Sequence, residues 1–338
     1  MRLIKTAIAV AFAASASAVT AQPTDAEIIQ RVRNVAANNQ MKEILSVEGV
    51  TQVDDNVLFL ENLKFEDGGE LELRAGNYQE IFLLAKEVRL NGPSLKAFIR
   101  FYDRDPIAGQ DAPPPPGRPA KKSRSSGNGD DGINGQTGSP GSTGVTRQLP
   151  TLYIVADEFQ VRKDPHYPNE VPDIRIYLDG IDGGTGGRGG TGQAGQHGQD
   201  GRHGEANHGI CSKGPRSGGD GGDGGAFGKG GAGGDGGDGG SIIFIVSPRI
   251  VDDIKDIRWL SRGGLPGRGG LNGEGGAPGD GGSRGERPGT CSGASKGSGG
   301  NPGPSPAPNS RGPDGSLEGA RGTVKYIEYD DVASLFNP

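Results

Sequence analysis

The stretch from Gly219 to Gly240 reads GDGGDGGAFGKGGAGGDGGDGG and decides the architecture of the chain. Glycine occupies every third position of this stretch, and nearly two of every three residues are glycine. A period of three residues is that of the polyproline II helix, which makes no internal hydrogen bonds. Each backbone N–H and C=O group must therefore find water or a neighbouring segment. The stretch predicts a helix with two bare faces that packs against several neighbours.

The same register recurs elsewhere in the chain. Glycines spaced by three run from Gly129 to Gly144, from Gly180 to Gly204 and from Gly264 to Gly285, and a broken run joins Gly297 to Gly315. Because proline lacks an N–H donor, we expect the proline-free runs inside a bundle and the proline-rich last run at its edge. Disordered linkers are the alternative interpretation of all these segments.

The composition excludes several classes of protein. Glycine accounts for 65 of 338 residues and hydrophobic residues for only 31%, too few for an ordinary dense core of side chains. No apolar run reaches the roughly 18 residues that a membrane-spanning helix needs, and glycine is confined to separate segments, which excludes collagen along the whole chain. The net charge of -6 argues against nucleic acid as a partner, because phosphate backbones require a basic face.

The N-terminus predicts export. Arg2 and Lys5 precede an alanine-rich apolar stretch, and small residues follow at the cleavage candidates 16–18 and 19–21. Residues 1–21 are expected to form a signal peptide, with a membrane anchor as the alternative. The mature protein is then secreted, held at the cell surface or periplasmic.

Apolar segments with strand periodicity separate the glycine-rich segments and form a repeat. An Ile-Arg-apolar segment precedes each glycine-rich segment, at 99–101, 174–176 and 257–259. An apolar strand follows each one, at 152–155, 242–246 and 324–327, and 81–84 matches these strands. The unit recurs about every 70 to 90 residues, in the manner of repeat proteins that stack units around a shared core.

These patterns predict a mainly β protein with a small solenoid-like or layered β core. One N-terminal helix is expected to cap it, because residues 24–45 have an amphipathic pattern and Thr24 and Glu27 have capping-box spacing. Residues 22–50 would form this helix and a lead-in, and residues 51–338 the β repeat scaffold.

The glycine-rich insertions of this scaffold lie at 104–148, 180–240 and 263–322. We expect the second and third to project as hairpin arms of polyproline II or polyglycine II type, and the first as a shorter arm. Within the first, residues 111–124 contain four consecutive prolines followed by basic residues, which indicates an exposed, protease-sensitive linker.

The cysteines point to a disulfide. Cys211 and Cys291 lie at the tips of the two expected hairpins, where a bond between them would tie the arms together. An exported chain meets an oxidising compartment in which such a bond persists.

Metal binding is a weaker hypothesis. His197, His203 and His208 precede Cys211, and a histidine cluster beside a thiol is typical of zinc or copper sites. A disulfide explains Cys211 better, so neither a metal nor another cofactor is expected. The Gly-Gly-Asp repeats at 218–225 and 233–240 suggest calcium, but their carboxylates would stack about 9 Å apart along one edge. Solvated acidic stripes are the preferred interpretation.

Catalysis is not expected either. Acidic pairs at 157–158, 252–253 and 330–331 follow aligned strands, and paired carboxylates serve glycoside hydrolysis. Their repetition is more typical of an exposed edge, where Arg100, Arg175 and Arg258 would form a ladder with them. The sequence contains no nucleophile elbow, phosphate loop or zinc-protease motif.

The period-three runs resemble the polyglycine II bundles of glycine-rich insect antifreeze proteins and of some phage tail adhesin tips. The chain as a whole resembles exported bacterial-type glycine-rich, collagen-like repeat proteins. The resemblance covers residues 127–144, 180–240 and 264–315, concerns backbone type only and implies no activity.

The expected function is that of a non-enzymatic exported protein with a structural, adhesive or surface-binding role. Its expected partners are a polysaccharide, an extracellular matrix or cell-surface component, or another copy of the chain. A β-helical carbohydrate-active enzyme and an ice- or mineral-binding protein are the alternatives.

Overall fold

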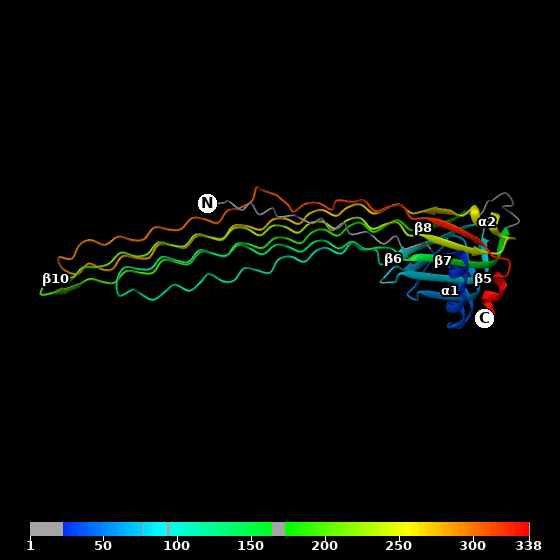
Figure 1. The fold of residues 1–338 in the computed structure, drawn as a ribbon, viewed down its shortest axis with the longest axis horizontal. Helices are drawn as coiled ribbons and strands as arrows, with labels where there is room; N and C mark the ends of the chain where they lie inside the picture. Colours follow the sequence, from blue (N-terminus) through cyan, green and yellow to red (C-terminus); the bar gives the residue numbers. More distant parts are fainter. Residues whose placement is uncertain (1–22, 77, 93–94, 164–172, 338) are drawn as a thin grey trace, which may run out of the picture.

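A computed structural model describes residues 23–76, 78–92, 95–163 and 173–337 of the chain. The expected signal peptide lies outside these residues. Figure 1 shows a core of strands and helices at one end, from which a long bundle of glycine-rich runs projects.

Two parallel sheets build the core, and successive strands of the core alternate between them. Among the described residues, one sheet has six strands in the order β1-β3-β5-β7-β11-β13 and the other has five in the order β12-β8-β6-β4-β2. The strands of the first sheet are β1 (Lys42–Val47), β3 (Val57–Phe65), β5 (Glu80–Gly92), β7 (Thr151–Lys163), β11 (Ile242–Val246) and β13 (Val324–Glu328). Those of the second are β2 (Val50–Val53), β4 (Gly69–Arg74), β6 (Lys96–Tyr102), β8 (Asp173–Tyr177) and β12 (Arg258–Leu260).

The register confirms the predicted alignment of the strands that follow the glycine-rich segments. Ile81, Leu152, Ile242 and Val324 lie side by side across β5, β7, β11 and β13. The Ile-Arg-apolar segments are offset by comparison, because Ile99 of β6 pairs with Ile176 of β8. The repeat is therefore in register in the six-stranded sheet and shifted by two residues between β6 and β8.

Apolar side chains fill both faces of the six-stranded sheet. Leu60, Leu83 and Phe244 are buried between the two sheets. The other face of this sheet is covered by α1 (Asp25–Ala37) and the 3₁₀ helix η1 (Val332–Phe336), which bury Ile28 and Phe336 against it. A short helix, α2 (Val251–Lys255), links β11 to β12.

Helix α1 begins as the sequence predicts and ends earlier. The Thr24 hydroxyl accepts a hydrogen bond from the Glu27 N–H at 3.3 Å, and the Glu27 carboxylate accepts the Thr24 N–H at 2.7 Å. This capping box satisfies two of the donors that a helix start leaves free. The helix stops at Ala37 because Lys42–Val47 pairs with β3, so the predicted helix over 24–45 is too long.

The predicted fold class, mainly β with a solenoid-like or layered core, is wrong. Strands make up 28% and helices 8% of the residues that the structure describes, so most of these residues belong to neither. The core has two parallel sheet layers with few helices and is α/β-like rather than a solenoid. Apolar segments in a sequence indicate where strands lie, but their spacing does not show how the sheets are layered.

Six runs form the bundle in the described part of the chain, and all but the first are rich in glycine. We define them as runs 1 (107–126), 2 (127–147), 3 (178–204), 4 (215–240), 5 (261–286) and 6 (295–322). Runs 1, 3 and 5 lead away from the core after β6, β8 and β12. Runs 2, 4 and 6 return to it and lead into β7, β11 and β13. The hairpin of runs 1 and 2 ends before the others in Figure 1, as expected of a shorter arm.

Backbone hydrogen bonds with a period of three connect the runs. In run 4, the N–H groups of Gly219, Gly222 and Gly225 donate to run 3 at 2.8–2.9 Å, and the preceding glycines of the same triplets donate to run 6. Runs 2 and 5 also donate to run 4, through glycines such as Gly132 and Gly279. Runs 3 and 4 therefore lie at the centre, and proline-rich run 6 lies at the edge, which confirms the predicted order.

In most triplets of run 4, two positions are glycine because the runs approach so closely. A Cβ atom on Gly222 would lie 2.2 Å from the carbonyl oxygen of Ile133, and one on Gly221 would lie 2.0 Å from that of Gly279. The third position of each triplet points outward and carries the side chains, such as Asp220 and Lys229.

Several of these outward side chains bind the backbone of the next run. The carboxylates of Asp220 and Asp223 accept hydrogen bonds from the Ser298 and Asn301 N–H groups at 2.6 Å. Asp235 accepts the Ser316 N–H at 2.7 Å, and this hydrogen bond is the main reason that its pKa is lowered. The acidic stripes are therefore more than solvated edges, because they satisfy donors between parallel runs.

Run 1 is largely exposed over residues 111–124, as predicted, but it is hydrogen-bonded to run 3 and so is not a free linker. The Nε2 groups of Gln193, Gln196 and Gln199 in run 3 donate to carbonyl oxygens of Gly117, Ala120 and Ser123 in run 1. The Oε1 atoms of the same glutamines accept backbone N–H groups of run 2. A glutamine ladder thus holds run 1 where its prolines cannot donate.

Close backbone packing predicts that one extra methyl group destabilises the bundle. We expect Gly222→Ala to lower the free energy of unfolding by about 1–3 kcal/mol, because its Cβ would overlap a backbone oxygen. Gly299→Ala is the matched control, since its Cβ would be 3.8 Å from the nearest atom, and should change stability by less than about 0.5 kcal/mol. Chemical denaturation followed by circular dichroism measures both, and equal effects would contradict close packing.

The glutamine ladder predicts that run 1 resists proteolysis in the intact protein. Gln196 is only 5% exposed and binds runs 1 and 2 together. Gln196→Ala should accelerate trypsin cleavage after Lys121, Lys122 and Arg124, whereas Gln136→Ala, which changes an exposed side chain, should not. Cleavage sites are read by mass spectrometry, and rapid cleavage of the unchanged protein would show that run 1 is a loose linker.

Candidate functional site

The far tip of the bundle carries a small β-hairpin. Strands β9 (Glu205–Asn207) and β10 (Ile210–Lys213) pair antiparallel, with Asn207 opposite Ile210. His208 and Gly209 connect them with φ angles of 49° and 81°. Positive φ at both positions is the geometry of the type I′ turn, which matches the twist of a two-residue hairpin. The hairpin lies at the end of runs 3 and 4, opposite the core (Figure 1).

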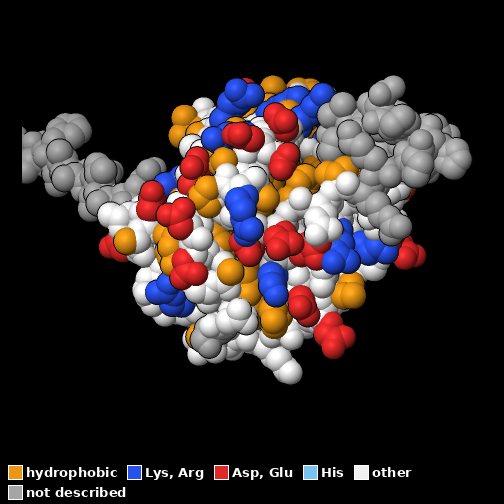
Figure 2. Space-filling model, turned by 90° about the vertical axis from the view of Figure 1, so that its right-hand side faces the viewer, with side chains coloured by type: hydrophobic (Ala, Val, Ile, Leu, Met, Phe, Trp, Pro, Cys, Tyr) orange, Lys and Arg blue, Asp and Glu red, His pale blue; other side chains and the backbone are white. Residues whose placement is uncertain are grey.

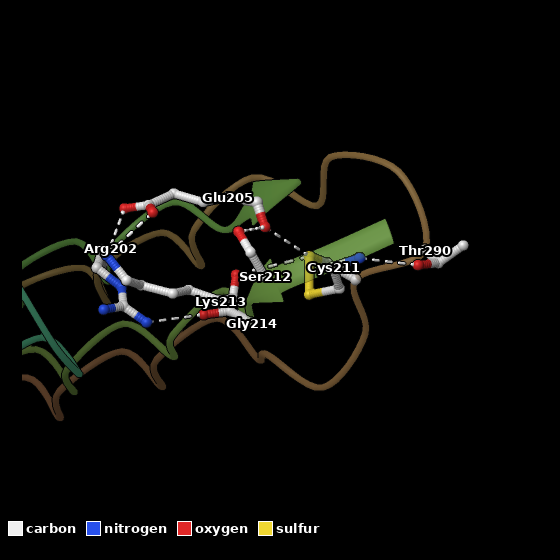
Figure 3. The surroundings of a disulfide bond; sticks show 8 residues. Arg202, Glu205, Cys211, Ser212, Lys213, Gly214 and Thr290 are labelled. Atoms are coloured by element: carbon white, nitrogen blue, oxygen red, sulfur yellow. Dashed lines mark hydrogen bonds and ion pairs between the residues drawn. A yellow bond between two sulfur atoms is a disulfide. The ribbon is translucent and has the colours of Figure 1, made fainter. Parts of the chain in front are cut away.

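A disulfide ties this hairpin to the loop between runs 5 and 6. Cys211 and Cys291 are bonded, with an S–S distance of 2.06 Å and a Cα–Cα distance of 4.8 Å. The Cys211 N–H also donates to Thr290 Oγ1 at 3.1 Å, and the Thr290 N–H donates to the Gly209 carbonyl at 3.3 Å. Figure 3 shows this contact beside the disulfide. The tips of two separate hairpins are thereby joined.

Polar contacts hold the base of the hairpin. Ser212 Oγ donates to the Glu205 carbonyl at 2.9 Å, and Lys213 Nζ lies 3.0 Å from the Glu205 carboxylate. Arg202 of run 3 donates from Nη2 to the Gly214 carbonyl at 3.1 Å, as Figure 3 shows. These contacts connect the two strands of the hairpin with each other and with the last turn of run 3.

The hairpin presents one large apolar side chain to solvent. Ile210 is 71% exposed, whereas Cys291, which is bonded to the next residue, Cys211, is only 7% exposed. Glu205 and Lys213 on the same hairpin are exposed and oppositely charged. The tip can therefore make apolar contact through Ile210 with charged groups around it, an arrangement suited to binding.

The structure does not gather the histidines into a cluster. The Nδ1 atoms of His197 and His203 accept the N–H groups of Asp280 and Glu286 in run 5, each at 2.9 Å. His208 lies in the hairpin turn. No three His, Cys, Asp or Glu residues within the described part of the chain are placed to hold a metal ion. Two of the histidines thus serve as hydrogen-bond acceptors between runs.

The predicted ladder of arginines and acidic pairs is wrong. Arg100 pairs with Glu70 and Glu72, and Arg175 pairs with Asp173, all on the five-stranded sheet.

The acidic pairs themselves lie in different elements. Asp157 is inside β7 and pairs with Arg249 at 3.3 Å, Asp252 is in α2, and Asp330 follows β13. The predicted repeat of an acid after each strand therefore does not hold, because β7 continues past Asp157 to Lys163.

Sequence reasoning missed the hairpin of β9 and β10. Its signal is the pair His208-Gly209 between two short segments, since X-Gly is typical of two-residue turns. The glutamine ladder has a signal too, because Gln193, Gln196 and Gln199 recur with the period of the run.

Comparison with known proteins places the chain in no family. No family model and no curated protein matches it, so nothing supports the resemblance to collagen-like repeat proteins. One solved structure matches weakly, a nine polyproline type II helical bundle antifreeze protein from the springtail Granisotoma rainieri. It is 22% identical over 58% of this chain and 92% of that chain, and its TM-score of 0.10 is too low to support an argument.

Across the residues that the structure describes, no helix combines the length and the apolar character that crossing a bilayer requires.

Because the disulfide joins the two tips, its removal is expected to cause a measurable loss of thermal stability. The bond closes a loop of 80 residues, for which chain entropy gives roughly 3–5 kcal/mol of stabilisation. The double change Cys211→Ser and Cys291→Ser should lower the thermal midpoint, and the exposed change Ser292→Ala should not. Calorimetry measures the midpoints. An unchanged midpoint in the double variant, or two free thiols in the exported protein, would contradict the assignment.

Proposed function

We propose that this is a non-enzymatic exported protein that binds a surface or an extended partner through the tip of its bundle. The observation that carries the proposal is an exposed hairpin, anchored by a disulfide, at the far end of a hydrogen-bonded bundle. The core then serves as the base from which the bundle projects.

The bundle supports this role because it fixes the position of the tip. Backbone bonds every three residues connect neighbouring runs from the core to the hairpin. A binding group held in place before contact loses little conformational entropy when it binds. A flexible glycine linker would lose far more, which favours an ordered bundle for presenting a contact surface.

The chemistry of the tip favours a partner with both polar and apolar surface. Ile210 offers an apolar contact, and Glu205 and Lys213 offer charges of both signs. A polysaccharide, a matrix component, a cell-surface component or another copy of the chain fits this description. Nucleic acid does not, since the net charge is -6 and acidic and basic side chains are mixed on the end of the core that Figure 2 shows.

Export fits the same account. Disulfides persist in oxidising compartments and are rare in reducing ones. A disulfide at the tip therefore supports a secreted, cell-surface or periplasmic location, in agreement with the expected signal peptide.

The two alternative functions make different predictions. A carbohydrate-active enzyme would turn over a glycan and lose that activity when Asp157, Asp252 or Asp330 is changed. An ice-binding protein would show thermal hysteresis, and the Asp, Lys and Arg side chains along the runs argue against a flat face of small residues.

If the protein binds through its tip, the exposed side chain of Ile210 should determine the affinity. The intact protein is screened against immobilised glycans, matrix components and itself, and Ile210→Ser should weaken the observed binding about tenfold. Ile133→Ser is the matched control, because Ile133 is 59% exposed on run 2, away from the tip. Binding that survives in the Ile210→Ser protein, or no binding by the intact protein to any of these surfaces, would contradict the proposal.

A further inference from the structure

An open hollow of about 500 Å³ lies on the five-stranded sheet, at the edge formed by β12. Four of its lining residues matter for the argument: Arg175 and Tyr177 of β8, and Arg258 and Leu260 of β12. Arg175 is directly opposite Arg258 in the parallel pairing of these strands. Two guanidinium groups and an aromatic ring therefore line one hollow, and it lies in the core, away from the tip.

Among the residues that the structure describes, cations outnumber carboxylates at and beside this hollow. Asp173 makes hydrogen bonds of 2.5–3.0 Å with Arg175, and its carboxylate lies 3.9 Å from Arg258. Lys96 on β6 is paired in register with Asp173. The hydrogen bond from Arg175 is the main cause that lowers the pKa of Asp173, so this carboxylate stays ionised and neutralises one of the three cations.

The neighbouring strands β6 and β4 lack this excess, although Arg100 of β6 lies opposite Tyr177. Arg100 contacts both Glu70 and Glu72, and Glu72 also accepts a hydrogen bond from Gln52 at 2.7 Å. Two carboxylates therefore pair with the single guanidinium of Arg100. Arg258, by contrast, is 74% exposed at its side chain, and within the described ranges it shares the Asp173 carboxylate with Arg175.

The hollow also offers apolar surface with a fixed orientation. The ring of Tyr177 stacks on Phe98 of β6 with centroids 6.4 Å apart and planes 21° from parallel. Leu260 beside it is 36% exposed. Aromatic and apolar groups next to cations suit a ligand that has both a flat apolar face and an anionic group.

We propose that this hollow binds a carboxylate-bearing saccharide, namely a uronic-acid unit of an acidic polysaccharide. Arg258 receives the sugar carboxylate, because a guanidinium presents paired donors that match a carboxylate. Tyr177 and Leu260 contact the apolar face of the sugar ring. The proposal concerns the core only and does not rest on binding by the tip.

Calorimetric titration of the full, disulfide-bonded protein tests this site. The probes are a galacturonic acid tetrasaccharide, a galactose tetrasaccharide and sodium acetate. We expect the acidic tetrasaccharide to bind at least about tenfold more tightly than either of the others, since a hydrogen-bonded ion pair is at stake.

Matched variants assign the binding to the hollow. Arg258→Ala should weaken binding of the acidic tetrasaccharide about tenfold. Arg249→Ala removes an arginine of similar exposure, 72% at its side chain, that pairs with Asp157 elsewhere, and should leave binding unchanged. Ile210→Ser at the tip should also leave it unchanged, which separates this site from the proposed function.

Each contrary result overturns the proposal. Absence of binding, or equal binding of the acidic and neutral tetrasaccharides, would show that the hollow does not select a carboxylate. If acetate bound as tightly as the acidic tetrasaccharide, the hollow would be a site for simple anions and not for a saccharide. Unchanged affinity in the Arg258→Ala protein would place the binding elsewhere.

Discussion

The structure depends on how closely one backbone approaches another in the bundle. Carbonyl oxygens of neighbouring runs lie about 2 Å from the place that a Cβ atom of Gly221 or Gly222 would take, so both positions require glycine. The same approach lets the central runs 3 and 4 each donate to two neighbours in alternating bonds. High glycine content therefore supplies order here, because the backbone groups of the bundle satisfy one another where side chains would do so in an ordinary core.

The core sets the starting positions of the runs. Outward runs follow β6, β8 and β12, which are neighbours in the five-stranded sheet, and returning runs lead into β7, β11 and β13 of the six-stranded sheet. Neighbouring strands in a sheet lie about 4.8 Å apart, and parallel strands all end at the same edge. The runs therefore leave the core side by side and in the same direction. The sheets act as a template that aligns the glycine triplets of segments about 80 residues apart.

Much of this architecture can be predicted from the sequence, and the parts that cannot share one cause. The period of three shows where the runs lie, and the proline pattern orders runs 4 and 6. The glutamine ladder, the Asp220 and Asp223 contacts and the pairing of Arg100 with Glu72 all depend on the lateral offset between segments, which no local pattern contains. The layering of the sheets depends on it too. Tyr177 and Arg258 meet at one hollow only through the register of β8 and β12.

The account places two separate contact surfaces on one chain, an exposed hairpin at the tip and a cationic hollow on the core, with an ordered bundle between them. Its central claim is that the bundle is held by backbone hydrogen bonds, and amide hydrogen exchange across residues 219–240 tests this most directly. The account predicts that the glycine amides of this stretch exchange about a thousandfold or more slowly than those of an unstructured peptide of the same sequence. Exchange at the rate of the unstructured peptide would contradict it.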